Sequence, residues 1–447
     1  MNIRKTALIR HIFLMASISF FFPAQGWAAE ALSVEEAVRE AVAANIDLKI
    51  SRDGLEAAAA AKNSKRAEFL PSFGAMYRYQ YNHEESKTTL TLPGGDVTLS
   101  DIPKSQFAFT ASVTQPVFAG FALRNQYILA GLGLDAAKFN EMLVKRVVSY
   151  KARESFFSVL KAEKIVEIAK EAVALIDAHR DSAQNFYDVG MTPLNDLLKA
   201  QVELANARLD LVIAENALEM ARADFNVILR RPIDSAVSIL DTLDHDPFGK
   251  TLGECLEAAE KNRMEIKLAG LDAEMARKSL DVERAGFLPA VSLVGTYRQF
   301  GDDWNTNGGR GASDPSMWDV AVTASWPVWE WGKTHFRAKE KRHLFLAAQK
   351  QKISVLDSVR LEVRQAYLKT MEAEKTIAAV EKAIEQAQEN FRISRERYRE
   401  QMATSTDVLD ARTLLSTTLT NYHSALYDFN IARAALEKAM GTGENED

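Results

Sequence analysis

The sequence predicts an α+β membrane protein in which a transmembrane β-barrel, shared between several chains, continues into a rod of long paired helices. Three observations support this fold class: an internal repeat across nearly the whole chain, helical stretches too long for a small globular core, and four segments with one apolar and one polar face. The composition agrees, with 47% hydrophobic residues and only 11 prolines and 21 glycines among 447 residues. Such values are typical of a folded, helix-rich protein.

The chain contains two copies of one structural unit. Phe69-Leu70-Pro71 recurs as Phe287-Leu288-Pro289, 218 positions later, and Pro116-Val117-Phe118 recurs as Pro327-Val328-Trp329, 211 positions later. The second offset then holds without a gap through the rest of the copy, which indicates a tandem duplication. We expect a first repeat over residues 29–230, a proline-containing linker over 231–251, a second repeat over 252–441 and a tail over 442–447.

Each copy predicts two helices, a strand, a loop, a second strand, a very long helix and a final helix. In the first copy the helices begin near Ser33, where Glu36 completes a capping-box pattern, and then run over about 46–68, 122–189 and 193–229. A helix of 68 residues is roughly 100 Å long at about 1.5 Å per residue. We therefore expect a rod of paired helices with the strands at one end.

The final helix of the first copy carries a coiled-coil-like seam, because apolar residues recur at spacings of three and four. These residues are Leu194, Leu198, Val202, Ala205, Leu209 and Val212. The seam supports the interpretation of the helices as paired elements.

The N-terminus predicts a signal peptide over residues 1–28. Three basic residues precede the apolar stretch 12–22, and Gly26-Trp27-Ala28 offers small residues for cleavage. The alternative is an uncleaved anchor, but the apolar stretch is short for a membrane span, and no later stretch reaches about 18 apolar residues. An exported chain of this kind is periplasmic, secreted or an outer-membrane barrel.

Four strands, expected at about 70–81, 106–118, 288–299 and 317–329, alternate between apolar and polar residues. The residues expected to face lipid are Phe73, Tyr77, Phe109, Val113, Val291, Leu293, Val320 and Val322. This alternation and the aromatic residues at the strand ends are typical of transmembrane barrels, although any single strand also fits a soluble, half-buried sheet. Because open edges are excluded from lipid, several chains must share one barrel. Loops at 82–105 and 301–316 suit the exterior side.

With two related motifs, at residues 187–201 and 398–412, the sequence resembles the TolC family of outer-membrane efflux and secretion channels. The resemblance covers nearly the whole mature chain and also rests on the duplication and on the Phe-Leu-Pro and Pro-Val-(Phe/Trp) motifs around the strands. It implies a homotrimer with a twelve-stranded barrel in outer-membrane lipid and a twelve-helix periplasmic tunnel. A periplasmic adaptor (membrane fusion protein) and an inner-membrane pump would dock at the helical tip.

The resemblance also implies site residues. Asp407 and Asp410 lie in the motif of the family's selectivity ring, with Tyr398, Asp196 and Tyr187 near the periplasmic gate, and the docking tip would contain Gly190, Met191, Thr192, Gln401 and Met402. Asp407 and Asp410 are three residues apart and share a helix face. Repeated around a narrow pore they would favour cations; the alternative is a pair of acids that stabilises a helix start.

Two positions depart from the family pattern. Gln401 stands where a turn glycine is usual, and Ala403 stands where the best-known member carries an arginine at its gate. These departures predict a different hydrogen-bond network in the closed state.

Other classes of function find little support in the sequence. The net charge of −6 offers no broad surface for nucleic acid, and the scattered histidines offer no zinc motif. We expect no catalytic residues, no cofactor and no metal, and hence no enzyme. The competing hypothesis is a soluble periplasmic coiled-coil adaptor, which the four amphipathic strands and the duplication disfavour. Drug, metal and protein cargo all remain open, because the pump largely chooses the cargo.

Overall fold

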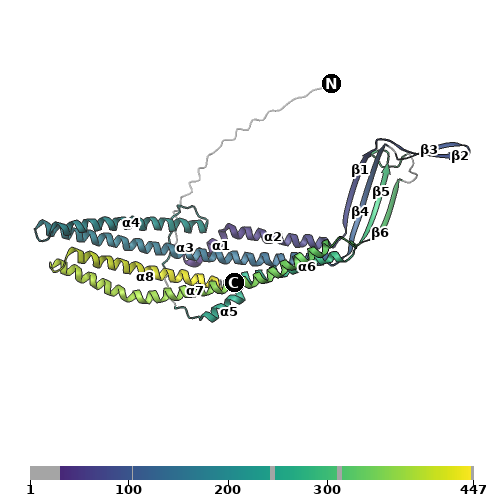
Figure 1. The fold of residues 1–447 in the computed structure, drawn as a ribbon. Helices are drawn as coiled ribbons and strands as arrows, with labels where there is room; N and C mark the ends of the chain where they lie inside the picture. The colour runs from purple at the N-terminus through teal and green to yellow at the C-terminus, as the bar shows by residue number, and fades with distance from the viewer. Residues whose placement is uncertain (1–30, 103, 242–246, 310–314, 444–447) are drawn as a thin grey trace, which may run out of the picture.

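The computed structural model describes residues 31–102, 104–241, 247–309 and 315–443, so the expected signal peptide lies outside the described residues. Helices form a long rod and a β-sheet lies at one end of it (Figure 1). The first copy contains α1 (Val34–Ala44), α2 (Ile46–Ala67), β1 (Ser72–Tyr81), β4 (Ser105–Ala119), α3 (Ala122–Asp188) and α4 (Leu194–Leu229). The second contains α5 (Leu252–Asn262), α6 (Met264–Arg284), a 3₁₀ turn (Ala285–Phe287), β5 (Ala290–Gly301), β6 (Ser316–Ser325), α7 (Lys333–Arg399) and α8 (Ser405–Met440).

The long helices match the sequence expectation closely. Helices α3 and α7 each have 67 residues, about 100 Å at 1.5 Å per residue. Capping boxes begin α1, α5 and α8, where the N-cap hydroxyl and an acidic residue three positions later satisfy each other's backbone N–H groups. Within the described ranges, no helix combines the length and the apolar character needed to cross a membrane.

The sheet has the order β1-β4-β5-β6, and all neighbouring strands are antiparallel. Its central pair, β4 and β5, joins one strand from each copy. Strands β1 and β6 form the two edges, and neither has a second partner among the described residues. Within the described sheet, each edge strand therefore presents a row of backbone N–H and C=O groups that can pair with another strand.

Prolines set the ends of the strands, since proline donates no hydrogen bond to a ladder. Strand β1 begins after Pro71 and β5 after Pro289, while β4 passes Pro116 only through a register shift. The expected strand over 317–329 was too long at its end: β6 stops at Ser325, two residues before Pro327.

The expected exterior loop at 82–105 was wrong in one respect, because it contains a β-hairpin. Strands β2 (Ser86–Leu92) and β3 (Gly95–Ile102) pair through a turn at Pro93-Gly94 and extend beyond the sheet (Figure 1). Leu90 pairs with Val97 and Thr91 with Asp96, which is the alternation of a strand. The glycine and proline content drew the prediction towards a loop, although it marks the hairpin's turn.

A sharp turn joins each second strand to its long helix. Gly120 and Phe121 both adopt positive φ before α3, and Trp331 and Gly332 do the same before α7. Gly120 is required, because a Cβ atom at this position would lie 2.5 Å from the carbonyl oxygen of Ala285. This close approach fixes the end of the sheet against the end of α6.

The rod changes its helix partners along its length. Near the sheet, α2 contacts α3, α3 contacts α6, and α6 contacts α7. Farther away, α3 packs on α4 and on α8, and α7 packs on α8. The two long helices therefore run through both halves and tie them together.

The predicted seam on α4 does not form the contact within the chain. Leu198, Val202 and Leu209 are exposed, whereas Leu197, Ala200, Leu204 and Ala207 are buried against neighbouring helices. Both sets have helical spacing, and the sequence pattern alone did not show which one faces the chain's own helices. The exposed seam on α4 is therefore available for contact with another molecule.

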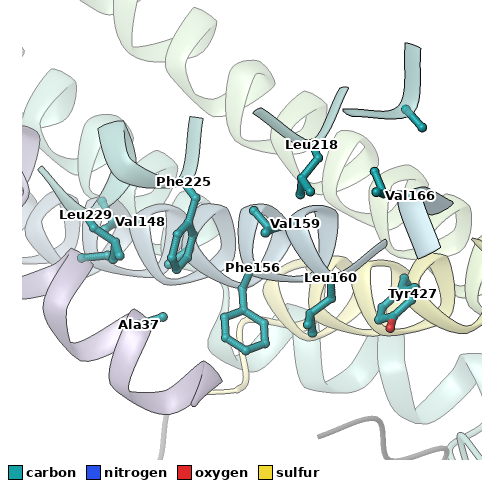
Figure 2. Packing of buried hydrophobic residues seen from close by; sticks show 13 residues of the cluster. Ala37, Val148, Phe156, Val159, Leu160, Val166, Leu218, Phe225, Leu229 and Tyr427 are labelled. Atoms are coloured by element: carbon teal, nitrogen blue, oxygen red, sulfur yellow. The ribbon is translucent and has the colours of Figure 1, made fainter. Parts of the chain in front are cut away.

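The largest buried cluster lies where α1, α3, α4 and α8 meet (Figure 2). Phe156 of α3 is fully buried, and its ring lies 6.2 Å from that of Phe225 and 5.6 Å from that of Phe157, centroid to centroid. Ala37 of α1 faces this cluster without any exposed surface. The cluster holds α1 against the long helix α3.

We expect Phe156→Ala to destabilise the helical region by about 3–5 kcal/mol, because it removes a buried ring and leaves a cavity. Thermal unfolding followed by circular dichroism measures the change. Met142→Ala, on the same helix but half exposed, is the control and should change stability little. Equal effects of the two substitutions would contradict this account of the core.

Candidate functional site

One face of the four-stranded sheet is apolar from edge to edge. The strand register places Phe73 beside Val113, Val113 beside Gly295, and Gly295 beside Val320. The same register pairs Tyr77 with Phe109, Leu293 with Val322, and Val291 with Ala324. Paired residues project to the same side of a sheet, so the eight residues singled out in the sequence lie on one surface.

None of the described residues covers this apolar face. Phe73 is 80% exposed and Val322 is 72% exposed, although both would be buried in an ordinary soluble sheet. An exposed apolar surface that spans four strands indicates contact with lipid or with another protein.

The opposite face is polar. Ser112 pairs with Thr296, and Thr296 pairs with Asp319. Arg298 Nη1 donates a hydrogen bond to Asp319 Oδ1 at 2.9 Å, and both side chains keep contact with solvent. Charged groups on this face and large apolar groups on the other give the sheet two distinct environments.

At the far end of the rod, the two helical hairpins turn in the same way. Gly190 N–H donates to the Tyr187 carbonyl and Met191 N–H donates to that of Phe186; Gln401 and Met402 repeat this pattern after α7. Gln401 adopts a φ of 60°, as Gly190 does at 74°. Gln401 therefore keeps the turn geometry that glycine has in the first hairpin. A left-handed backbone costs a non-glycine residue such as Gln401 about 1–2 kcal/mol.

The expected docking residues lie together at this tip. Met191 and Met402 are 53% and 68% exposed, and Gly190 and Gln401 are also exposed. Thr192 is partly buried. Each hairpin turn therefore exposes one methionine, a flexible side chain that can adapt to an apolar partner.

Asp407 and Asp410 both line a groove of about 370 Å³ beside the second turn, together with Arg397 and Leu414. Asp407 is also a capping residue, since its carboxylate accepts hydrogen bonds from Thr404 N–H at 2.7 Å and Thr404 Oγ1 at 2.8 Å. These bonds lower the pKa of Asp407. The capping interpretation is therefore correct for Asp407, and the same bonds keep its carboxylate charged and in place on the groove.

Tyr398 does not line the groove. It is buried, and its ring lies 4.8 Å from that of His179 and 5.6 Å from that of Phe186. Burial and the Asp196 carboxylate raise the pKa of Tyr398, so Asp196 of one hairpin and Tyr398 of the other are close enough to interact. Tyr187 is 39% exposed.

Ala403 packs against the same apolar cluster as Tyr398 and Phe391. Among the described residues, the Tyr398 hydroxyl has no hydrogen-bond partner. An arginine at position 403 would place a charge beside this cluster, so the departure from the family pattern removes a polar group from the tip.

Direct polar contacts join the two hairpins near the tip. His179 Nε2 lies 2.8 Å from Ser405 Oγ, and both residues are buried. Lys199 Nζ donates to Thr406 Oγ1 at 2.9 Å on the surface. Burial lowers the pKa of His179 from 6.5 to about 4, although the Asp196 carboxylate acts in the opposite direction.

Comparison with known proteins identifies the family. The family model described as outer membrane efflux protein matches residues 37–229 and 255–442, which is most of the chain in two segments. The chain belongs to the outer membrane efflux protein family. The two matched segments coincide with the two copies of the repeat.

Individual relatives and solved structures agree with this assignment. Outer membrane protein TolC of Escherichia coli K12 is 22% identical over 429 residues, which cover 94% of this chain and 84% of that protein. Alkaline protease secretion protein AprF of Pseudomonas aeruginosa is 22% identical over 86% of this chain and 79% of that protein. The Campylobacter jejuni CmeC outer membrane channel has the same fold, with a TM-score of 0.78, 17% identity and coverage of 98% and 94%.

The chain is therefore an outer-membrane channel of the efflux and secretion type, with its helical rod in the periplasm. The competing hypothesis of a soluble adaptor is excluded, since the family model and the relatives are outer-membrane proteins. The membership also accounts for the association of an exposed apolar sheet with a rod of helices in one chain.

Sequence reasoning missed the polar contact between the hairpins of this efflux protein. The sequence contains seven histidines, and no motif surrounds His179. One signal was present: His179 follows Ile176 by three residues and precedes Ala183 by four, within a buried stripe of α3. A polar residue on such a stripe predicts a buried partner, but the partner itself comes from a hairpin more than two hundred residues away.

We expect the contact between the hairpins to weaken as the pH falls from 6.5 towards 4. The folded-state pKa of His179 is below its value in water, so the separated hairpins bind the proton more strongly and the contact loses about 2 kcal/mol by pH 5. Hydrogen exchange of the tip helices at pH 7 and pH 5 measures this loss. In His179→Gln, which retains a donor towards Ser405, hydrogen exchange should depend less on pH. An unchanged pH dependence in this variant would show that other groups cause it.

Proposed function

We propose that three copies of this chain assemble into one channel, with a twelve-stranded barrel in the outer membrane and a helical tunnel in the periplasm. The observation that supports this proposal is the four-stranded sheet, which has one apolar face and, within the described ranges, two edges without a partner strand. Edge groups in hydrocarbon need partners, and pairing β1 of one copy with β6 of the next supplies them. The exposed seam on α4, including Leu198 and Val202, gives the neighbouring copies a further apolar surface.

In this assembly the apolar face contacts lipid and the polar face lines the lumen. Val320 and Val322 then lie against hydrocarbon, whereas Thr323 and the ion pair of Arg298 with Asp319 face water. Transmembrane barrels show this arrangement because water remains inside and lipid outside. Cargo passes from the helical tunnel through the lumen to the exterior, with no catalytic step.

At the periplasmic end, the Asp407 and Asp410 groove becomes part of a ring of six carboxylates around the entrance. Both side chains are exposed on one face of α8, and capping bonds keep Asp407 ionised. Arg397 lies in the same groove and offsets part of this charge. A ring of carboxylates attracts cations and repels anions, so it sets the preference of the closed entrance.

The exposed tip, with Met191 and Met402 on adjacent turns, is the surface for a periplasmic adaptor that connects the channel to an inner-membrane pump. Exposed methionines adapt to a partner's surface and bind through apolar contact. The family is named for efflux and the relative AprF for alkaline protease secretion, and a channel connected to a pump suits both kinds of export.

Val322→Arg should reduce the amount of assembled trimer far more than Thr323→Arg. An arginine on the lipid face of a barrel costs about 2–4 kcal/mol at the midplane, whereas lumen positions tolerate it. Native mass spectrometry in detergent, together with membrane fractionation, measures the assembled fraction. Equal losses would show that the two faces are not lipid and lumen, and a stable monomer with full β content would contradict the shared barrel.

Asp407→Asn with Asp410→Asn should weaken the cation preference and the block by multivalent cations in planar-bilayer recordings. The amide oxygen of the asparagine that replaces Asp407 can still accept the Thr404 hydrogen bonds, so trimer formation should stay intact. Asp210→Asn, an exposed carboxylate on α4 outside the groove, is the control. Unchanged ion selectivity in the double variant would restrict Asp407 to its capping role.

A further inference from the structure

A polar pocket lies at the base of the sheet, between the start of α3 and the end of α6. Its volume is about 380 Å³, within the usual range of about 300–1,000 Å³ for small-ligand sites. The side chains that determine its chemistry are Phe121, Arg124, Lys278, Asp281, Arg284 and Leu288. Nothing in the proposed transport path uses this pocket.

The pocket carries more positive than negative charge. Asp281 lies 3.6 Å from Lys278 Nζ and 3.6 Å from Arg284 Nη1, which is longer than a direct hydrogen bond. Arg124 is exposed and, among the described residues, has no ion pair or hydrogen bond of its side chain. Three cationic groups around one carboxylate leave room for a second anion.

The N-terminus of α3 adds to the positive electrostatic potential of the pocket. Helix α3 has neither a capping side chain nor an acidic residue in its first turn. The N–H groups at the start of a long helix favour an anion. The side chains and the helix terminus therefore attract the same kind of ligand.

The lining of the pocket borders the apolar sheet face. The Phe121 ring, which lines the pocket, lies 5.3 Å from the Phe118 ring, and Phe118 pairs with Val291 of the apolar face. Leu288, also in the lining, is 40% exposed. The basic groups thus lie next to the apolar surface, at the end of the sheet that joins the periplasmic helices; the inference rests on the proposed contact of that surface with lipid.

A neighbouring copy that closes the barrel would leave the pocket open. Helix α3 follows β4 and α6 precedes β5, and these are the two central strands of the sheet. The unpaired edges belong to β1 and β6, whose connections run to α2 and α7. The pocket therefore lies away from the proposed subunit interface.

We propose that this pocket binds the phosphate of an anionic phospholipid in the periplasmic leaflet of the outer membrane. Arg124 and Lys278 contact the phosphate oxygens, Arg284 reaches the rest of the headgroup, and an acyl chain runs along Phe121 and Leu288 towards the sheet. Guanidinium groups suit phosphate oxygens, and basic pockets beside transmembrane segments recognise anionic headgroups. Each channel would hold three such lipids, one per chain.

The test is a titration of the delipidated full-length trimer with short-chain phosphatidylglycerol, read by native mass spectrometry. Phosphatidylcholine and soluble glycerol phosphate are the comparison ligands. We expect phosphatidylglycerol to bind at least tenfold more tightly than either one, with saturation near three per trimer. Arg124→Gln should weaken binding about tenfold, and Asp281→Asn, which removes the competing carboxylate, should tighten it several-fold.

Arg66→Gln is the matched control, because Arg66 is the first-copy counterpart of Arg284, lies at the same depth before β1 and is outside the pocket. It should change the affinity less than twofold. Equal binding by wild type and Arg124→Gln, or equal binding of phosphatidylcholine, would overturn the proposal. Equal binding of glycerol phosphate would make this a site for soluble phosphate and overturn the lipid assignment. Failure of the shared barrel would appear separately, as loss of the trimer itself.

Discussion

The need to satisfy backbone hydrogen bonds at the edges of the sheet governs the rest of this structure. Among the residues that the structure describes, strands β1 and β6 each present an unpaired edge. In hydrocarbon every unsatisfied N–H or C=O group costs several kcal/mol. Four strands are too few to close on themselves, and the proposed assembly of three copies supplies the missing partners. The exposed apolar sheet face and the exposed seam on α4 have the same origin, because each awaits a surface that one chain does not supply.

The duplication gives the chain both its sheet and its helical rod. Each copy sends one strand pair into the sheet and one 67-residue helix along the axis. The two copies meet at the central β4–β5 pair and again where α3 contacts α6 and α8. The close approach of Gly120 to Ala285 fixes the junction between sheet and helices. A displacement at either end of the rod is therefore resisted at the junction and along two continuous helices.

The tip combines apolar packing with direct polar contacts between the hairpins. Phe186 of the first hairpin packs against the apolar cluster around Tyr398 of the second, and Ile176 packs against Leu409. The buried contact of His179 with Ser405 and the surface contact of Lys199 with Thr406 add to this packing. Because burial lowers the pKa of His179, this buried contact makes the junction of the hairpins near the expected entrance sensitive to pH.

The sequence by itself determined the repeat, the long helices to within a residue or two, and the alternation of the four barrel strands. These features depend on periodicity and on local capping, which neighbouring residues specify. It did not determine the β2–β3 hairpin, the face of α4 that packs within the chain, or the partner of His179. The tip residues Asp407 and Tyr398 show the division most clearly. Both lie in one motif, yet the structure exposes the first on a groove and buries the second beside His179. Only the tertiary structure decided these points, because each depends on which surfaces meet across hundreds of residues of chain, and several helix faces had equally suitable spacing.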